Sequence, residues 1–286
     1  MDRRIFRKKT VDKILSIQGF TLIELLVVIA VVGVLAGALI VLINPAAMLD
    51  RARIAKGKSF YGQLTRSLGF YNVGEWKFND ASNTGMDSSG NNLTGTLVGG
   101  VSYVANCDLG LGGCLTFDGT DDRVGIPTSS LSLPRITISA WIKTTSSTEQ
   151  YIAERSNSSF YFSTGSAGAS GKVCFYLAVA SANWLCSSNR VDNGSWHHVA
   201  GTYDGTNKII YIDGTNAASI AGSGDINPAP SSVINIGVRN NAGVYIYYFT
   251  GQIDEVSIFN QALSQAAIQQ YYAKGVMKRA LASTKK

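Results

Sequence analysis

The chain has 286 residues, of which 45% are hydrophobic and 15% charged. This composition excludes a largely disordered chain, and the length allows one or two domains with a sizeable core. The net charge of +6 does not indicate nucleic-acid binding, because residues 71–273 carry fifteen acidic and nine basic side chains. The basic excess lies in the terminal segments, and basic segments beside an apolar run are typical of membrane proteins.

The N-terminal region is a basic segment followed by an apolar run from Phe20 to Ile43, 24 residues long. As a helix this run would be about 36 Å long, enough to cross a hydrocarbon layer of roughly 30 Å. A secretory signal peptide would have a shorter apolar run with a small-residue cleavage site after it. Glu24 lies inside the run, where an unpaired acid costs about 2.5–3.5 kcal/mol on insertion scales. We therefore expect Glu24 to have a partner.

The stretch GFTLIELLVVIAVVGVLA, residues 19–36, resembles the N-terminal signature of type IV prepilins and type II secretion pseudopilins. The resemblance implies that a prepilin peptidase cuts between Gly19 and Phe20, and that the new amine of Phe20 is methylated. It also implies that Glu24 pairs with the α-amino group of Phe20 in a neighbouring pilin subunit during filament assembly. The alternative is a plain membrane anchor, in which Glu24 only reaches the nearby interface.

The amino-acid composition changes near residue 71, where Gly, Ser, Asn and Thr become frequent. Short strand-like runs such as RITISAWIKT, KVCFYLAV, WHHVAGTY and VINIGV follow one another, separated in places by Asp-Gly pairs. Asp-Gly tolerates the positive φ angles of tight hairpins, so these runs predict an antiparallel β-sandwich or barrel. One helix is predicted near the end, at LSQAAIQQYYA, with Ser264 as its N-cap.

Four segments follow from these patterns. We predict a leader peptide over 1–19 and an N-terminal helix over 20–70 that spans the membrane over 20–43. We predict a β domain over 71–275 and a basic tail over 276–286. The predicted fold class is thus mainly β, with an N-terminal transmembrane α-helix followed by an antiparallel β-sandwich.

The four cysteines, none in a C-x-x-C spacing, indicate disulfides formed in an oxidising compartment. Three pairings are possible, and four unpaired buried thiols are the alternative. We favour the pairs Cys107–Cys114 and Cys174–Cys186, because each closes a short local loop.

Several stretches of the β domain, in order, resemble laminin-G-like domains with the concanavalin A-type jelly roll. They include CLTFDGTDDRVGIP, WHHVAGTYDGTNKIIYIDGT and FTGQIDEVSIFNQALSQAAIQQYY. Members of this family are lectin-like sandwiches of secreted and surface proteins, many of which bind glycans and others protein. The resemblance further implies a structural Ca²⁺ held by Asp87, Asn92 and Asp254, with turn hydrogen bonds as the alternative role for Asp87 and Asn92.

Aromatic residues in polar surroundings are candidates for ligand binding, because amphipathic rings suit half-exposed surfaces. The candidates are Trp184, Tyr245 and Tyr247, and packing at the rim of the core is the alternative for each. We predict no enzymatic activity, since the domain lacks the alternating carboxylates that jelly-roll glycosidases carry on one strand. The adjacent residues His197 and His198 point to opposite faces of a strand and do not form one metal site.

Together these features predict a type IV pilin-like minor or tip subunit that displays a lectin-like domain for adhesion to an extracellular glycan or protein. The expected location is the bacterial cell membrane, crossed once, with the C-terminal domain outside and the chain in some cases part of a pilus. The alternatives are a structural pilin or pseudopilin of a pilus or type II secretion system, and a plain membrane-anchored surface protein.

Overall fold

The computed structural model describes residues 22–23, 25–31, 69–107, 112–128, 131–155, 159–179, 184–227 and 233–283. The chain divides into two compact units, Met1–Lys56 and Gly57–Lys286. In the first unit, residues 22–23 and 25–31 are α-helical, and apolar side chains such as Leu22 are exposed. No helix within the described residues is both long enough and apolar enough to cross a membrane.

The predictions for the N-terminal segment fall largely on residues outside this description. Gly19, Phe20 and Glu24 all lie outside it, as does most of the proposed span over 20–43. The cleavage site, the methylated residue, the assembly contact and the domain boundaries therefore stay predictions.

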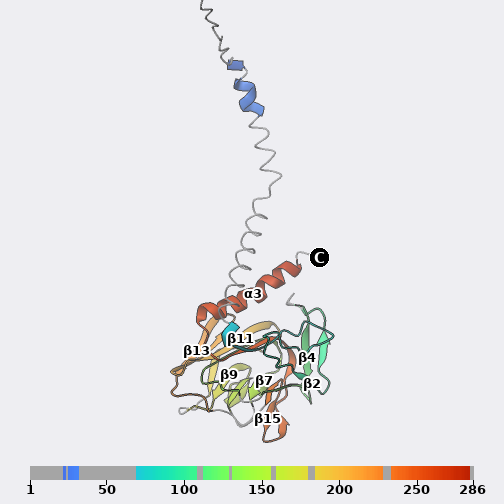
Figure 1. The fold of residues 1–286 in the computed structure, drawn as a ribbon, viewed down its shortest axis with the longest axis vertical. Helices are drawn as coiled ribbons and strands as arrows, with labels where there is room; N and C mark the ends of the chain where they lie inside the picture. Colours follow the sequence, from blue (N-terminus) through green and yellow to red (C-terminus); the bar gives the residue numbers. More distant parts are fainter. Residues whose placement is uncertain are drawn as a thin grey trace, which may run out of the picture. The chain divides into compact units, whose positions relative to one another are not determined.

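The second unit is a sandwich of two antiparallel sheets (Figure 1). The eight-stranded sheet has the order β13 (Thr215–Ala221), β12 (Asn207–Ile212), β11 (Trp196–Tyr203), β6 (Ile136–Lys143), β17 (Thr250–Phe259), β4 (Cys114–Asp118) and β3 (Ser102–Val104), with β1 (Asn72–Trp76) paired to β17. The seven-stranded sheet has the order β10 (Leu185–Arg190), β9 (Lys172–Leu177), β8 (Phe160–Thr164), β7 (Gln150–Arg155), β14 (Val233–Ile236), β5 (Arg123–Pro127) and β2 (Thr96–Val98). The predicted mainly β fold is confirmed.

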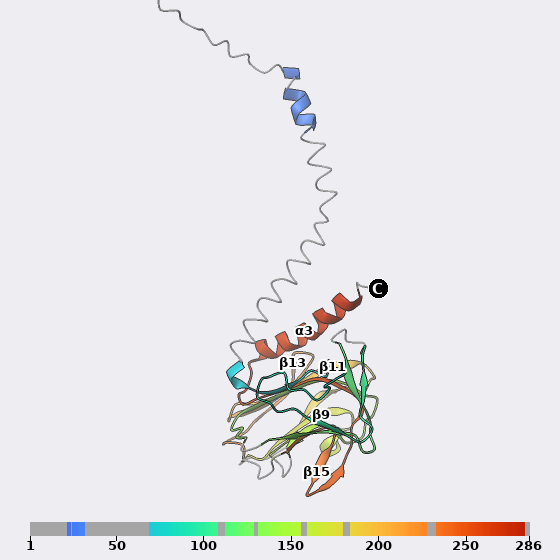
Figure 2. The same cartoon turned by 45° about the vertical axis from the view of Figure 1, so that its right-hand side comes forward.

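One hairpin, two 3-10 turns and one helix complete the unit. A separate hairpin of β15 (Arg239–Asn241) and β16 (Val244–Ile246) projects at the end of the sandwich opposite the helix (Figure 2). The 3-10 turns are η1 (Gly69–Tyr71) and η2 (Ser166–Gly168), and the helix is α3 (Gln265–Ser283). Helix α3 continues to Ser283, through most of the segment that the sequence analysis assigned to the basic tail.

The core lies between the two sheets and follows from the alternation of apolar residues along each strand. Ile138 of β6 and Val199 of β11 come from one sheet, and Phe162 of β8 and Ile234 of β14 come from the other. All four are fully buried, and each such side chain contributes about 1.5–3 kcal/mol through removal from water. The predicted Asp-Gly turns are also present, since both Asp213 and Gly214 have positive φ between β12 and β13.

Helix α3 covers the outer face of the eight-stranded sheet. Its N-terminus is capped as predicted, because the N–H of Ala267 donates to Oγ of Ser264 at 3.3 Å. Ile268 packs with Phe259 of β17, and the ring of Tyr272 stacks on Trp141 of β6 at 5.8 Å between centroids. The helix therefore belongs to the sandwich unit. It packs on the eight-stranded sheet and not on the outer face of the seven-stranded sheet, which is the second broad face of the sandwich.

Candidate functional site

A row of four side chains crosses the outer face of the seven-stranded sheet. Strand register places Asn235 of β14 opposite Glu154 of β7, then Tyr161 of β8, then Tyr176 of β9. Residues directly opposite each other in antiparallel strands point to the same face. Their neighbours in sequence, including Phe162, lie in the core, so the row points away from the core.

Trp184 extends this row beyond Tyr176. It lies just before β10, and its ring stacks on that of Tyr161 at 6.1 Å and 19°. It also lies 5.4 Å from the ring of Tyr176 at 45°. Tyr161 is buried beneath these contacts, whereas Tyr176 and Trp184 are half-buried and keep part of their rings accessible.

Arg239 of β15 lies among three tyrosine rings on the same face. Its guanidinium carbon is 4.8 Å from the ring centre of Tyr161, 5.6 Å from that of Tyr151 and 6.0 Å from that of Tyr247. These distances are within the range of cation–π attraction. None of the ion pairs between described residues involves Arg239. Burial raises the pKa of Tyr151 far above its usual range, so its hydroxyl stays protonated beside the cation.

Tyr247 joins this cluster from the opposite side, through a stack on Tyr151 at 6.0 Å and 16°. Its side chain is 41% exposed, the most open of the rings in the cluster. We use the name aromatic face for Tyr151, Tyr161, Tyr176, Trp184, Tyr247 and Arg239 together.

The structure thus brings two of the three predicted ligand residues, Trp184 and Tyr247, into one cluster. The third, Tyr245, makes a different contact, because the guanidinium of Arg123 lies 4.0 Å from the centre of its ring. Sequence reasoning missed Tyr161 and Tyr176. The sequence did contain a signal for both tyrosines. In FYF and FYL each tyrosine stands between two apolar residues of the core, and side chains in a strand alternate between its two faces, so each tyrosine points away from the core.

The residues predicted to hold calcium have the following surroundings. Oδ1 of Asp87 accepts hydrogen bonds from the backbone N–H groups of Glu75 and Ser89, and Oδ2 accepts from the hydroxyl of Ser89 and the N–H of Leu93. Asn92 is exposed and has φ of 59°. Asp254 is fully buried, and its Oδ1 accepts from the N–H of Glu255. Asp87 therefore has the contacts of a turn residue, and calcium at these three residues stays a prediction.

The two histidines lie on opposite sides of β11. Nδ1 of His197 is 2.8 Å from Oδ2 of Asp213 at the rim of the sheet, while Nε2 of His198 is 2.8 Å from Oγ of Ser139 beneath α3. Burial lowers the pKa of His198 to about 4, so its ring is neutral at pH 7. Nδ1 of His198 has no hydrogen-bond partner among the described residues, so no acid orients the ring as in a catalytic triad. That the protein is not an enzyme stays a prediction.

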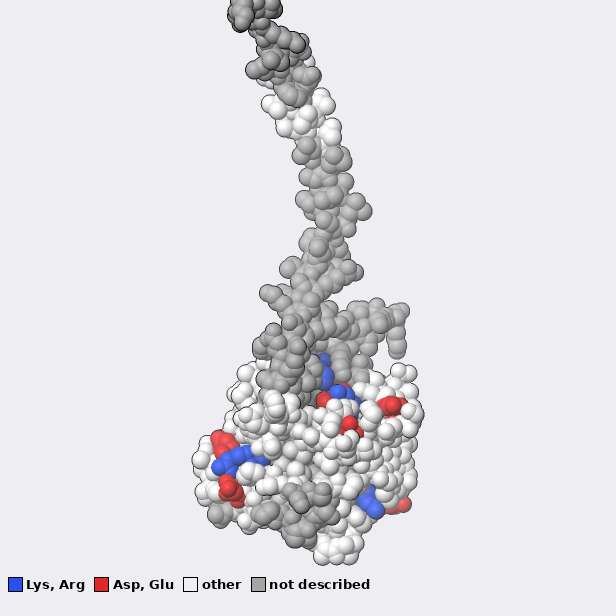
Figure 3. All heavy atoms as spheres, in the orientation of Figure 1, with Lys and Arg blue, Asp and Glu red and all other residues white. Residues whose placement is uncertain are grey.

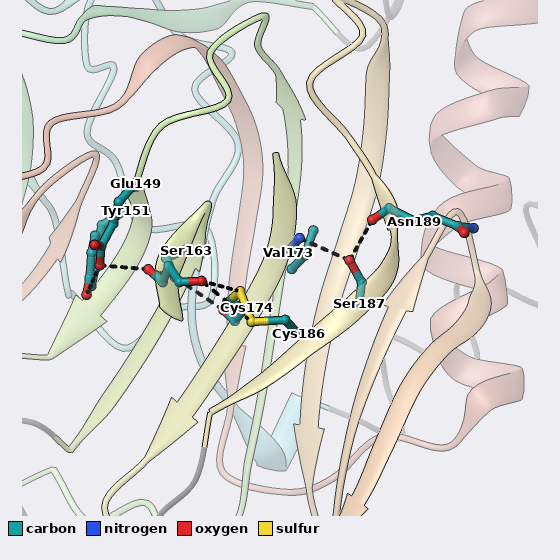
Figure 4. Close-up of a disulfide and its surroundings, with 9 residues drawn as sticks. Glu149, Tyr151, Ser163, Val173, Cys174, Cys186, Ser187 and Asn189 are labelled. Carbon is teal, nitrogen blue, oxygen red and sulfur yellow. Dashed lines mark hydrogen bonds between the residues drawn. A yellow bond between two sulfur atoms is a disulfide. The ribbon is translucent and has the colours of Figure 1, made fainter. Parts of the chain in front are cut away.

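Two disulfides are present, in the pairing that the sequence analysis favoured. Cys107 is bonded to Cys114, and Cys174 to Cys186. Figure 4 shows the second one between β9 and β10, with Ser163 of β8 beside it. Because β10 is the edge strand that follows Trp184, this bond ties the end of the aromatic face to the sheet.

Charge is not concentrated on the face of the second unit drawn in Figure 3. The acidic and basic side chains lie there in small mixed groups, and most of the described surface in that view is uncharged. The described surface in that view therefore has no basic stripe of the kind that binds nucleic acid.

A sandwich of two antiparallel sheets is the fold of lectin-like jelly-roll domains. Residues 118–269 match the family described as the concanavalin A-like lectin/glucanases superfamily, more than half of the chain, and the chain belongs to this family. Residues 15–40 match the prokaryotic N-terminal methylation motif, which implies membrane anchoring. No curated protein matches the chain.

Similar solved structures support the same fold. Domain 4 of AbnA, a GH43 extracellular arabinanase from Geobacillus stearothermophilus in complex with arabinotriose, has 20% identity and a TM-score of 0.56, covering 70% of this chain and 97% of that one. The binding domain of botulinum neurotoxin DC, in complex with rat synaptotagmin II, has 18% identity and a TM-score of 0.56, covering 72% of this chain and 52% of that one. The match thus spans about half the length of the neurotoxin structure. At these identities the likeness shows the fold alone.

Proposed function

We propose that this chain is a type IV pilin-like minor or tip subunit that binds an extracellular glycan through the aromatic face. The N-terminal methylation motif supports membrane insertion and processing by a prepilin peptidase. Membership of a lectin-like family supports binding by the sandwich. The single observation that carries the ligand class is the continuous set of rings from Trp184 to Tyr247 on one sheet face.

Sugar rings suit this surface for a physical reason. The C–H faces of a pyranose or furanose ring are apolar and flat, so they stack on exposed aromatic faces, while the hydroxyl groups at the edges need hydrogen bonds. Trp184 and Tyr247 offer accessible ring surface, and the partly exposed Tyr176 and Tyr247 carry phenol groups that suit the polar edges of a sugar. Among the similar structures, AbnA domain 4 was solved in complex with arabinotriose, and the botulinum neurotoxin DC binding domain with SialylT in one case and rat synaptotagmin II in another. A glycan is therefore the first ligand to test and a protein the second.

The binding prediction is tested with the full-length chain in detergent micelles on a glycan array. We expect binding to at least one glycan class, and Trp184→Ala to weaken that binding about tenfold, since one stacked aromatic anchor contributes on the order of 1.4 kcal/mol. Phe70→Ala is the matched control, because Phe70 is an exposed aromatic residue outside the aromatic face. Binding that survives Trp184→Ala and Tyr247→Ala together would contradict the proposal, and so would capture of a protein ligand alone.

The assembly prediction is tested at the N-terminus of the protein isolated from membranes. Mass spectrometry should find an N-methylated Phe20 as the first residue. An intact Met1 would rule out processing.

A second experiment tests the assembly role of Glu24. Glu24→Ala should abolish incorporation into filaments while membrane insertion persists, because it removes the carboxylate that pairs with the amine created by cleavage. Glu24→Asp keeps the charge and should retain part of the incorporation. Unchanged incorporation of Glu24→Ala would remove the assembly role of Glu24. A protein that is never found in filaments, even with Glu24 unchanged, would leave a plain membrane anchor.

A further inference from the structure

The turn between β4 and β5 gathers three carboxylates that none of the preceding assignments uses. One carboxylate oxygen each of Asp118, Asp121 and Asp122 lies within 4.8 Å of those of the other two. Asp118 and Asp121 are exposed, whereas Asp122 is only 1% exposed. None of the ion pairs between described residues involves any of the three.

Asp122 is the observation that separates this turn from an ordinary acidic loop. Its Oδ2 accepts a hydrogen bond from the backbone N–H of Asp118 at 2.8 Å. Its Oδ1 is buried and has no hydrogen-bond partner among the described residues. Burying a carboxylate with one oxygen unpaired, next to two further negative charges, is costly unless a cation compensates it.

The neighbouring β2–β3 turn approaches these oxygens closely and has glycine at both positions beside them. A Cβ at Gly99 would lie 2.9 Å from Oδ1 of Asp121, and one at Gly100 would lie 3.4 Å from Oδ1 of Asp122. Gly99 also has φ of 82°, which an L side chain rarely adopts. A Cβ at Gly99 would also lie 2.5 Å from the backbone O of Asp121, so the β2–β3 turn packs closely on the acidic turn, and side chains at these two positions would crowd the two oxygens.

The spacing fits the coordination of calcium. Ca²⁺ binds oxygen ligands at roughly 2.3–2.6 Å, so two oxygens on opposite sides of one ion are at most about 5 Å apart. The carboxylate oxygens of the turn, within 4.8 Å of one another, meet this limit. Mg²⁺ requires a nearly ideal octahedron and gives up its water reluctantly, so a partly exposed turn with three carboxylates favours Ca²⁺.

We propose that Asp118, Asp121 and Asp122 form a calcium site at the β4–β5 turn, distinct from the calcium predicted at Asp87, Asn92 and Asp254. Among the described residues, the side chain of Asp121 makes no hydrogen bond that holds the turn together, which makes it the residue to change first. The site lies next to Arg123, whose guanidinium covers Tyr245, so calcium binding would also fix the start of β5.

The test is thermal unfolding of the full-length chain in detergent, stripped with a chelator and then titrated with CaCl₂. Affinities of extracellular calcium modules are about 10⁻⁴ to 10⁻³ M, and a concentration tenfold above the dissociation constant should raise Tm by about 3–6 °C. Asp121→Asn should unfold at the same temperature as the unchanged chain without calcium, and should bind calcium at least tenfold more weakly.

Two control variants, Asp80→Asn and Asp87→Asn, separate this site from other acidic residues. Asp80→Asn, at an exposed acid outside the turn, should keep the full calcium response. A rise in Tm that is undiminished in Asp121→Asn overturns the proposal, as does no response in the unchanged chain. A response lost in Asp87→Asn but kept in Asp121→Asn overturns it in favour of the site predicted from the sequence.

Discussion

Replacing Cys174 and Cys186 together with alanine lowers the free energy of unfolding of the sandwich by about 3 kcal/mol. The disulfide closes a loop with a sequence separation of 12. Chain-entropy arguments give about 3 kcal/mol for a loop of this length, because the bond limits the unfolded chain. For a domain of this size the change corresponds to a fall in Tm of about 6–12 °C, measured by calorimetry or circular dichroism.

The other disulfide provides the matched control. Cys107 and Cys114 are separated by 7 residues, so the same replacement there should cost about 2 kcal/mol. The two pairs also differ in position, because β10 is an edge strand and Trp184 precedes it directly. Loss of the Cys174–Cys186 bond should therefore weaken glycan binding as well as stability. An unchanged Tm after its removal would show that this bond does not stabilise the sandwich.

Acidification destabilises the sandwich through one buried residue, His198. Its side chain is 1% exposed and lies against Trp141 and Tyr272, and burial lowers its pKa from 6.5 to about 4. The unfolded chain takes up the proton near pH 6.5, while the folded chain resists it down to about pH 4. Stability contributed by neutral His198 is therefore complete above pH 6.5 and is lost as the pH falls toward 4, by about 3 kcal/mol in total.

This prediction is checked by urea unfolding at a series of pH values between 7 and 4. Asp213 and Glu255 raise the pKa of His198 slightly against the effect of burial, so both stay in place in the comparison. His198→Gln, which keeps a polar side chain near Ser139 but does not titrate, should reduce the pH dependence over this window. The chain has only two histidines, so NMR titration assigns the ring directly. A His198 ring that titrates near pH 6.5 in the folded protein would contradict the prediction.

The sequence alone determined the features that depend on local order along the chain. The stretch GFTLIELLVVIAVVGVLA indicated the methylation motif, which the match at residues 15–40 confirms. The Asp-Gly turns and the short strand-like runs indicated the sandwich, and the N-cap at Ser264 was identified from its position before an apolar run. The pairing of the four cysteines could also be predicted from the sequence, because closing a short loop costs less chain entropy than closing a long one.

Only the tertiary structure decided which side chains share a surface. Tyr161 and Tyr176 lie on consecutive strands, but Tyr247 follows β16, much later in the chain, and the fold brings it against Tyr151, whose N–H donates to its carbonyl oxygen. The burial of His198 likewise depends on α3, which packs over its strand from the far end of the sequence. The physical reason is that a sheet joins strands distant along the chain, so contacts across it depend on topology, which the period of any one strand does not specify.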